Sequence, residues 1–451
     1  MNGNLLKSLF LAFVLIVLVR PVSAQTSSEL ITKQVAVELK EAGTLGNLLD
    51  ESQRSLITNL KLKGNINGTD IHLLREMLGV SEIAGTFTDD KLNAAHSYET
   101  EPTGSNLTTL DLKDANIVEG GDCYAWKLTG ATPQASYTEL YTTNNVLGYG
   151  MFRDCNSLTQ LILPSTIQSV ERFSLSGCTG LTALEIPDQV GEIGVFAFYA
   201  CTSLTSLVLP KALTMISTGM VAKCEALESI DIPETVEDIA TKAFSESGLK
   251  TFTIPPLVTT ITPFLLGCEK LETITIPNTV TRISSDGFNG AFAWLTSLKE
   301  LRIPESVSGS LGDFLLRGCS SLQTLYIPSR ATLTQRTLQG FSTLNDLYVY
   351  WDTPQQVNQL YIQKSFDYKQ CTLHVKKGCK DAYAAAYYWK SFKAIVEDAD
   401  EDESTGIANV AIEDTSSPQT IYSLDGKQRI SLAPGINIIR YADGKVKKVM
   451  K

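Results

Sequence analysis

The sequence has few histidines and none of the short motifs that mark common enzyme families. Its three histidines, His72, His96 and His374, are scattered along 451 residues, whereas a metal or catalytic site built on histidine needs such residues close together. The motifs G-x-S-x-G and H-E-x-x-H, the phosphate-binding loop and the dinucleotide fingerprint are absent. The sequence therefore predicts a protein that is not an enzyme and has no cofactor and no metal site.

The sequence is also short of positive charge. It has 38 lysines and arginines against 49 aspartates and glutamates, which gives a net charge of −11 and a pI near 5.0. Nucleic-acid binding proteins usually carry basic patches or stripes. We therefore expect no nucleic-acid partner.

Long apolar runs are missing as well, apart from one near the start. Residues 9–19 are apolar, follow Lys7, and are followed by Val22-Ser23-Ala24. This order of charged, apolar and small residues is typical of a secretory signal peptide, and the apolar run is too short to cross a bilayer. We predict cleavage after Ala24 and a secreted or cell-surface protein with no transmembrane segment in the mature chain.

What the sequence does contain is a repeated seven-residue phrase, read in one copy as Leu204-Thr205-Ser206-Leu207-Val208-Leu209-Pro210. The copies lie at residues 158–164, 181–187, 204–210, 227–233, 249–255, 271–277, 298–304 and 322–328, and a ninth at 344–350 lacks the proline. Successive prolines are 22 to 27 residues apart. A period of this size is the signature of a leucine-rich-repeat solenoid.

The chemistry of the phrase explains why it folds as one rung of a ladder. Side chains alternate across a strand, so Leu207 and Leu209 point inward while Ser206 and Val208 point outward. Proline has no N–H and ends the strand. Each turn leaves apolar residues that only neighbouring turns can bury. The sequence predicts a β-strand ladder of about nine rungs, with N- and C-terminal caps and a small C-terminal β domain.

The order of the repeat also resembles a known family. The phrase L-x-x-L-x-I-P, then V-x-x-I, a bulky residue and Cys-x-x-Leu, is similar to the BspA-like bacterial leucine-rich-repeat surface proteins, over residues 55–395 and most strongly over 150–350. The resemblance implies a non-enzymatic surface protein used in adhesion or host interaction.

The ends of the ladder are predicted to be different from its middle. Apolar spacing in 29–49 predicts an amphipathic helix, 56–62 a strand, and 71–78 a second helix, while 113–150 reads as an irregular insertion. Residues 371–375 predict a last strand and 380–392 a helix, with Trp389, Phe392 and Ile395 closing the end.

The last part of the chain is predicted to be separate. The run of acids in 397–403 lacks the glycine and spacing of a calcium loop, so we interpret it as a solvated linker. Asp425-Gly426 and Asp443-Gly444, each between apolar residues, predict hairpins. The stretch resembles the C-terminal sorting domains of Gram-negative bacteria, although an ordinary accessory β module is an equally open alternative.

These observations divide the chain into six predicted segments. They are a signal peptide (1–24), an N-terminal cap with a divergent first repeat (25–150), the leucine-rich-repeat solenoid (151–350), a C-terminal cap (351–396), an acidic linker (397–406) and a small β domain (407–451).

Six of the nine cysteines share one position of the repeat, three residues before its first leucine. These ladder cysteines are Cys155, Cys178, Cys201, Cys224, Cys268 and Cys319. Leu295 and Phe341 take the same position in other repeats, so the position wants an apolar residue. We predict that the ladder cysteines are buried thiols rather than disulfides, and the sequence leaves the state of Cys123, Cys371 and Cys379 open.

The outward positions suggest where a partner would bind. The middle rungs carry serine and threonine, whereas the final rungs bring Arg302, Tyr326 and Tyr348 into one column, followed by Tyr350 and Trp351. Tyrosine, tryptophan and arginine dominate interface energetics. We therefore predict a protein- or glycan-binding face here. The alternatives are that these aromatics pack under the C-terminal cap, or that the solenoid is a spacer or display scaffold without a ligand.

Overall fold

A computed structural model describes residues 29–82, 100–101, 106–129, 136–340, 342–356 and 367–399, and four strands at 418–423, 428–429, 436–441 and 446–450. The predicted signal peptide and most of the predicted acidic linker lie outside these residues. The chain divides into two compact units, one of residues 1–144 and 155–165 and the other of residues 145–154 and 166–451, and each is described by itself.

The first unit is built on a parallel sheet with the order β1-β2-β5-β9. Its elements are β1 (Val35–Leu39), α1 (Leu45–Leu48), α2 (Glu51–Arg54), β2 (Asn59–Ile66), α3 (Gly68–Met77), β3 (Ser81–Glu82), β4 (Thr100–Glu101), β5 (Thr109–Ile117), β6 (Gly120–Thr129), β7 (Ser136–Thr142) and β9 (Gln160–Ile162). The predicted strand at 56–62 and helix at 71–78 are confirmed as β2 and α3.

The predicted helix at 29–49 is wrong over most of its length. Val35, Val37 and Leu39 form strand β1, which pairs with β2 so that Val37 lies beside Leu62. These three apolar residues stand at alternate positions, as in a strand, and the spacing of the segment also fits a helix. Pairing with β2 favours the strand. Only Leu45–Leu48 is helical.

The prediction of an irregular insertion at 113–150 is also wrong. β6 and β7 form an antiparallel hairpin in which Trp126 pairs with Glu139 and Leu128 with Tyr137. The hairpin approaches the start of α3, where the Thr69 hydroxyl donates to Asp122 and accepts from its backbone N–H. The β-branched and aromatic residues of these strands favour extended structure, but no short turn motif marks the hairpin in the sequence.

The second unit contains most of the repeat and the C-terminal strands. Its elements are β8 (Val146–Leu147), β10 (Ser169–Val170), β11 (Ala183–Glu185), β12 (Glu192–Ile193), β13 (Ser206–Val208), β14 (Met215–Ile216), β15 (Asp238–Ile239), β16 (Thr251–Thr253), β17 (Thr260–Ile261), β18 (Thr273–Thr275), β19 (Arg282–Ile283), β20 (Glu300–Arg302), β21 (Gly309–Ser310), β22 (Thr324–Ile327), β23 (Ala331–Thr332), β24 (Asp346–Val349), β25 (Thr372–Val375), α5 (Lys380–Ala385), the 3-10 helix η1 (Trp389–Ser391), β26 (Ala394–Glu397), β27 (Pro418–Ser423), β28 (Gln428–Arg429), β29 (Ile436–Tyr441) and β30 (Val446–Met450).

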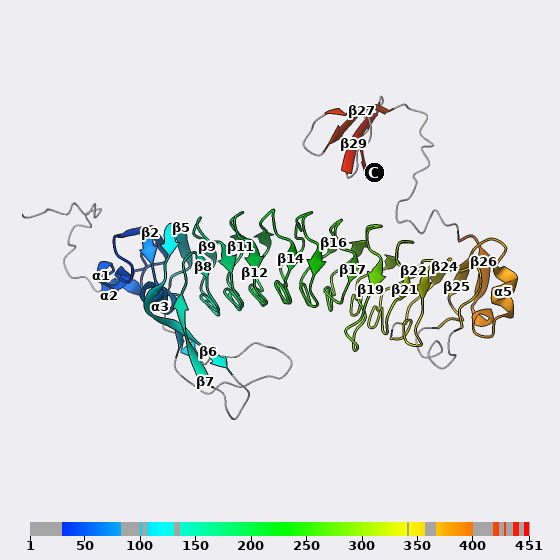
Figure 1. Cartoon of the computed structure of the whole chain (residues 1–451), viewed down its shortest axis with the longest axis horizontal. Coiled ribbons are helices and arrows are strands. Elements are labelled where there is room, and N and C mark those ends of the chain that lie inside the picture. Colours follow the sequence, from blue (N-terminus) through cyan, green and yellow to red (C-terminus); the bar gives the residue numbers. More distant parts are fainter. Residues whose placement is uncertain are drawn as a thin grey trace, which may run out of the picture. The chain divides into compact units, whose positions relative to one another are not determined.

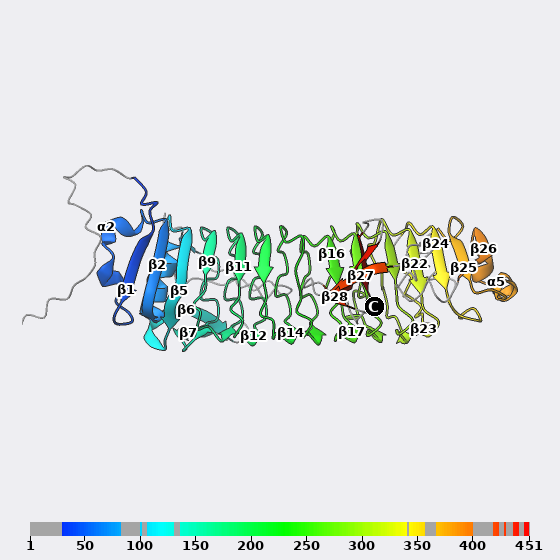
Figure 2. The same cartoon turned by 90° about the horizontal axis from the view of Figure 1, so that it is seen from above.

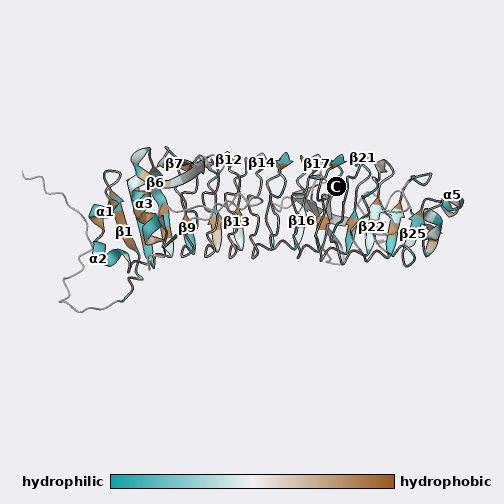
Figure 3. Cartoon of the chain, turned by 90° about the horizontal axis from the view of Figure 1, so that it is seen from below, coloured by the Kyte–Doolittle hydropathy of each residue, from teal (hydrophilic) through white to brown (hydrophobic). Residues whose placement is uncertain are grey.

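Most turns of the repeat have one strand formed by the phrase and one shorter strand that follows its proline. The phrase strands, such as β22 and β24, pair in parallel and follow one another in chain order (Figure 2). The shorter strands, such as β8, β10 and β12, pair among themselves in the same way (Figure 1). The phrase alternates as predicted: Leu207 is 6% exposed and Val208 is 51% exposed, and both hydrophobic and hydrophilic residues appear along the row of turns (Figure 3).

The turn that closes each repeat has left-handed backbone at a fixed position. This left-handed column consists of Asp154, Gly177, Ala200, Lys223, Glu246, Gly267, Trp294 and Gly318, all with φ between 57° and 78°. Each of the first seven residues donates its N–H to the carbonyl just before the next member, for example Lys223 to Ser245 and Gly267 to Ala293, and Gly318 donates to Gly340. This column was not predicted, because five of its eight members are not glycine, the residue that normally marks such backbone.

The prediction for the ladder cysteines is confirmed. All nine cysteines of the chain are thiols rather than disulfides, and the six ladder cysteines are buried. Cys201, Cys224 and Cys319 donate their S–H to the carbonyls of Leu175, Phe198 and Phe292, at 3.2, 3.2 and 3.0 Å. The thiol thus satisfies a buried carbonyl as well as filling apolar space.

Together, the described residues of the two units contain about 14 turns of parallel β-solenoid. The solenoid prediction is confirmed, but the number of about nine rungs is too low. The additional turns contain β1, β2, β5, β25 and β26, which lack the proline phrase and were therefore counted as caps or divergent pieces.

The end of the solenoid packs on aromatic residues. Trp389 of η1 contacts Trp351 and Tyr383 edge-on and stacks on Phe392. The predicted helix at 380–392 is limited to α5 and η1, and Ile395 lies in β26, where it pairs with Leu373.

The last four strands form an antiparallel sheet with the order β28-β27-β29-β30. The β content predicted for 407–451 is therefore confirmed, and both predicted Asp-Gly turns connect strands that pair as hairpins.

Candidate functional site

The most distinctive feature at the outward strand positions of the second unit is a column of stacked side chains, two of which are buried. Arg302 in β20 lies beside Tyr326 in β22, which lies beside Tyr348 in β24 and then His374 in β25. The Arg302 guanidinium is 3.5 Å from the centre of the Tyr326 ring. The two tyrosine rings stack at 4.3 Å, and Tyr348 stacks on the His374 ring at 4.0 Å. We call these four residues the stacked column.

The column forms because parallel strands place equivalent residues next to one another. Side chains on neighbouring rungs are separated by about 4.8 Å, close to the spacing that flat rings adopt when they stack. The first three members were predicted from their outward position in the sequence. His374 was not predicted, although it occupies the same position of the predicted strand at 371–375.

His374 is held by carboxylates on both sides of its ring. Its Nδ1 lies 2.7 Å from Asp398 Oδ1, and its Nε2 lies 3.2 Å from Asp346 Oδ1. Both nitrogens can donate at the same time only when the imidazole carries two protons. The two acids therefore fix the plane of the ring against Tyr348.

The other predicted site residues, and Tyr326 of the column itself, are buried. Tyr326 is 7% exposed and forms a buried cluster with Tyr350 and Ala399, against which Tyr348 packs. Trp351 is buried, donates its Nε1 hydrogen to the Ala331 carbonyl at 2.9 Å, and accepts from the Tyr383 hydroxyl at its own carbonyl. Tyr350 and Trp351 thus support the column and the C-terminal end rather than presenting their own side chains.

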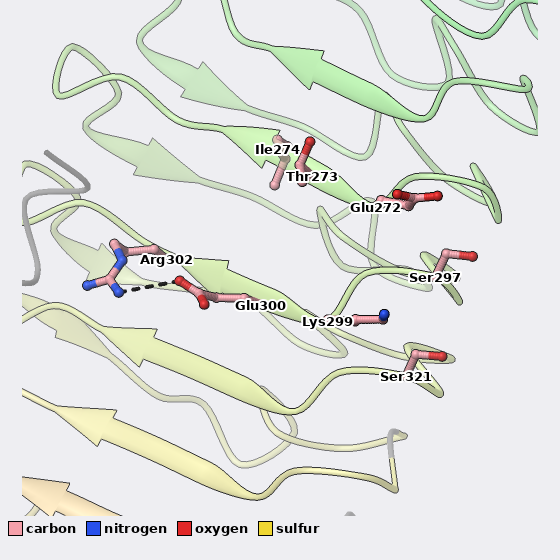
Figure 4. A pocket seen from close by; sticks show the side chains of 8 residues that line it. All are labelled: Glu272, Thr273, Ile274, Ser297, Lys299, Glu300, Arg302 and Ser321. Atoms are coloured by element: carbon pink, nitrogen blue, oxygen red, sulfur yellow. Dashed lines mark hydrogen bonds and ion pairs between the residues drawn. The ribbon is translucent and has the colours of Figure 1, made fainter. Parts of the chain in front are cut away.

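A shallow groove lies at the arginine end of the column (Figure 4). It is lined by Glu272, Thr273, Ile274, Ser297, Lys299, Glu300, Arg302 and Ser321. Arg302 belongs to both the groove and the stacked column, and its guanidinium is 3.3 Å from Glu300. The groove combines hydroxyl groups, two acids and two cations, which together suit a polar ligand rather than an apolar one.

Reactive groups are scarce in the residues that the structure describes. No group of three potential metal ligands occurs among them. Burial raises the pKa of the Cys201 and Cys319 thiols to about 12, so neither supplies a thiolate near neutral pH. Within the same residues, no helix is both long and apolar enough to cross a membrane.

A ladder of short parallel strands with leucine inside and one closing turn per repeat defines the leucine-rich-repeat class of solenoid proteins. Within this class, the model of the BspA type leucine rich repeat region matches residues 145–266 and 264–374, with six copies. These matches span about half of the chain, and the chain belongs to the BspA-type leucine-rich-repeat family.

Several solved structures resemble the chain. A leucine-rich-repeat protein of T. pallidum is 28% identical, covering 34% of this chain and 71% of its own, with a TM-score of 0.32. A leucine rich cell surface protein of Faecalibacterium prausnitzii is 18% identical, with coverages of 63% and 96% and a TM-score of 0.31. The pneumococcal vaccine antigen PcpA is 17% identical, with coverages of 77% and 82% and a TM-score of 0.36. Among the curated proteins, none matches this chain.

Proposed function

We propose that this protein is an exported, non-enzymatic surface or secreted protein that binds a protein or glycan through the stacked column and the groove beside it. The observation that supports the proposal is the unbroken stack from Arg302 to His374, in which the partly exposed Arg302 and Tyr348 rest on the buried rings of Tyr326 and His374. A rigid row of this kind loses little conformational entropy when a ligand is bound.

The location of the protein is part of the same proposal. The charged, apolar and small-residue order of residues 1–24 supports export. The antiparallel sheet of β27 to β30 supports a C-terminal domain that serves in secretion or in attachment at the outer surface of a Gram-negative bacterium. An accessory module without a sorting role would fold in the same way.

A spacer or display scaffold is the second candidate function. The outward residues of the middle rungs favour it, because Ser206, Thr251, Thr253, Thr273 and Thr275 are small, hydroxylated and exposed. Such residues keep the face soluble and favour β-strands, but they lack the large side chains that supply most of the energy of an interface.

The two candidates are separated by a binding screen with the full chain against a glycan array and host-cell surface proteins. A ligand bound by the native chain should bind at least about tenfold more weakly to the double variant Arg302→Ala with Tyr348→Ala. The matched control is Ser206→Ala with Thr251→Ala, on the same face but outside both the column and the groove. Unchanged affinity in the column variant, or no ligand in either screen, would favour the spacer.

A further inference from the structure

The longest repeat of the ladder carries an unusual surface that is separate from the stacked column. The prolines at positions 277 and 304 are 27 residues apart, and the extra length lies in residues 284–294. This expanded turn contains Phe288, which is 77% exposed, and ends at Trp294, which is 43% exposed. Large aromatic side chains of this exposure contribute little to the core.

Trp294 has strained backbone as well as an exposed side chain. It belongs to the left-handed column with φ 63°, and its N–H donates to the Arg317 carbonyl at 2.6 Å. Bulky residues rarely adopt this conformation, whereas glycine enters it freely. Glycine does occupy the equivalent position in both neighbouring turns, at Gly267 and Gly318. Trp294 is the aromatic member of the left-handed column, and its side chain is exposed.

The Trp294 indole packs closely against the backbone of Gly318 in the following turn. A β-carbon added to Gly318 would lie 2.3 Å from Cε3 of Trp294, so the ring rests directly on that backbone. The loop before it is also held in place, because the Asp286 carboxylate accepts the N–H groups of Phe288 and Asn289 at 2.9 and 2.7 Å.

Two arginines stand beside these rings. The Arg317 guanidinium lies 5.7 Å from the Trp294 ring and 5.5 Å from the Phe314 ring, and it donates to the Phe288 carbonyl. The Arg336 guanidinium lies 5.7 Å from the centre of the same Phe314 ring. Within the described residues neither arginine forms an ion pair with a carboxylate, and Asp313 is instead hydrogen-bonded by the Thr334 hydroxyl.

We propose that Phe288, Trp294, Phe314, Arg317 and Arg336, here called the insertion patch, bind an acidic sugar of a glycan chain. The C–H face of a sugar ring would stack on the open part of the indole, and its carboxylate would pair with the guanidinium groups, which match carboxylate geometry. Consecutive turns are about 4.8 Å apart, close to the length of one pyranose residue. A polysaccharide that runs along the turns therefore meets Arg317 and then Arg336.

An acidic peptide fits this surface less well. Extended peptides gain affinity by adding to an open backbone edge. Here the backbone N–H groups of Trp294, Phe314 and Gly318 already donate to the next turn. The insertion patch thus offers side chains rather than backbone partners, which suits a sugar.

The test uses the full chain, with trigalacturonic acid and its methyl ester as probes and calorimetry as the measurement. We expect the acid to bind at least about tenfold more tightly than the ester, because only the acid engages the guanidinium groups. Trp294→Gly should abolish binding while leaving the melting temperature equal or higher, since glycine removes the backbone strain. Arg317→Gln with Arg336→Gln should remove the preference for the acid.

The matched control is Ala200→Gly, which makes the same change of backbone freedom in the same column away from the patch. It should bind the acid as the native chain does. The proposal is overturned if trigalacturonic acid does not bind, if Trp294→Gly binds it normally, or if polyglutamate binds to the patch and the sugar acid does not.

Discussion

Single residues of the repeat often serve two purposes, and the ladder cysteines show this most clearly. Their side chains fill apolar space between turns and also donate to a carbonyl of the preceding turn, as Cys201 does to Leu175. Valine or alanine would fill much of the same space but would leave that carbonyl without the donor. The geometry explains why cysteine recurs at the position.

Burial of these thiols gives a prediction for alkaline pH. The pKa is raised to about 12 for Cys201 and to about 11 for Cys268. Below pH 9 the thiol is neutral in both states, but above it the unfolded chain ionises first. The free energy of unfolding should then fall by about 1.4 kcal/mol per pH unit for each thiol until the folded pKa is reached. Urea unfolding at pH 8 to 11 should show a shallower decline for Cys201→Ala, and identical slopes would contradict this account.

A second prediction concerns the two sides of the phrase. Leu207→Ala should lower the free energy of unfolding by about 2–5 kcal/mol, because it opens a cavity between turns. Val208→Ala removes an exposed side chain and should cost less than half as much. Denaturant midpoints of the two variants provide the measurement, and equal midpoints would mean that Leu207 is not a packing residue.

At the scale of elements, secondary structure is predictable from the sequence where the apolar residues follow a single spacing. It is poorly predictable where their spacing fits both a helix and a strand. The proline phrase leaves one interpretation, and its two sides are as predicted at Leu207 and Val208, whereas Tyr326 at an outward position is buried against Tyr350 and Ala399. In β1 the same apolar residues fit a helix or a strand, and only the neighbouring β2 decides between them. Trp351 was assigned to an outward surface because it follows the column directly, yet its hydrogen bond to Ala331 comes from a turn that is distant in sequence.

The start of helix α3 in the first unit is held by one buried carboxylate, that of Asp70. Asp70 accepts the N–H groups of Gly43, Leu45 and Asn67, at 2.6, 2.9 and 3.0 Å. Asp70→Ala should therefore lower the free energy of unfolding by about 3 kcal/mol, because it leaves three amides without their acceptor. The control is Asp50→Ala at the exposed start of α2, which should cost much less. Hydrogen exchange of residues 43–67 provides the measurement, and unchanged protection in Asp70→Ala would be inconsistent with this role.

For the whole molecule, the repeat accounts for the fold but leaves the choice of ligand open. Each turn buries its apolar residues against its neighbours, so turns add without changing the architecture. The stacked column and the insertion patch depend instead on a few side chains that are not part of the repeat pattern. For this reason the class of fold was predictable, whereas His374 and Trp294 became meaningful only through their neighbours in space.

One prediction applies to the whole chain and lies outside the described residues. The protein isolated from its native host should begin at Gln25, because export removes the segment that ends at Ala24. N-terminal sequencing or intact-mass spectrometry measures this. Recovery of the secreted protein with Met1 still attached would rule out cleavage at this position.

The expanded turn has a practical consequence for protein engineering. The left-handed column continues through it without a break, from Gly267 to Ala293 and from Trp294 to Arg317. The ladder therefore keeps its register although this turn is several residues longer than the others. Additional loop length adds only a modest entropic cost. The segment around Phe288 is therefore a suitable insertion site for grafting a foreign epitope while the rest of the solenoid stays unaltered.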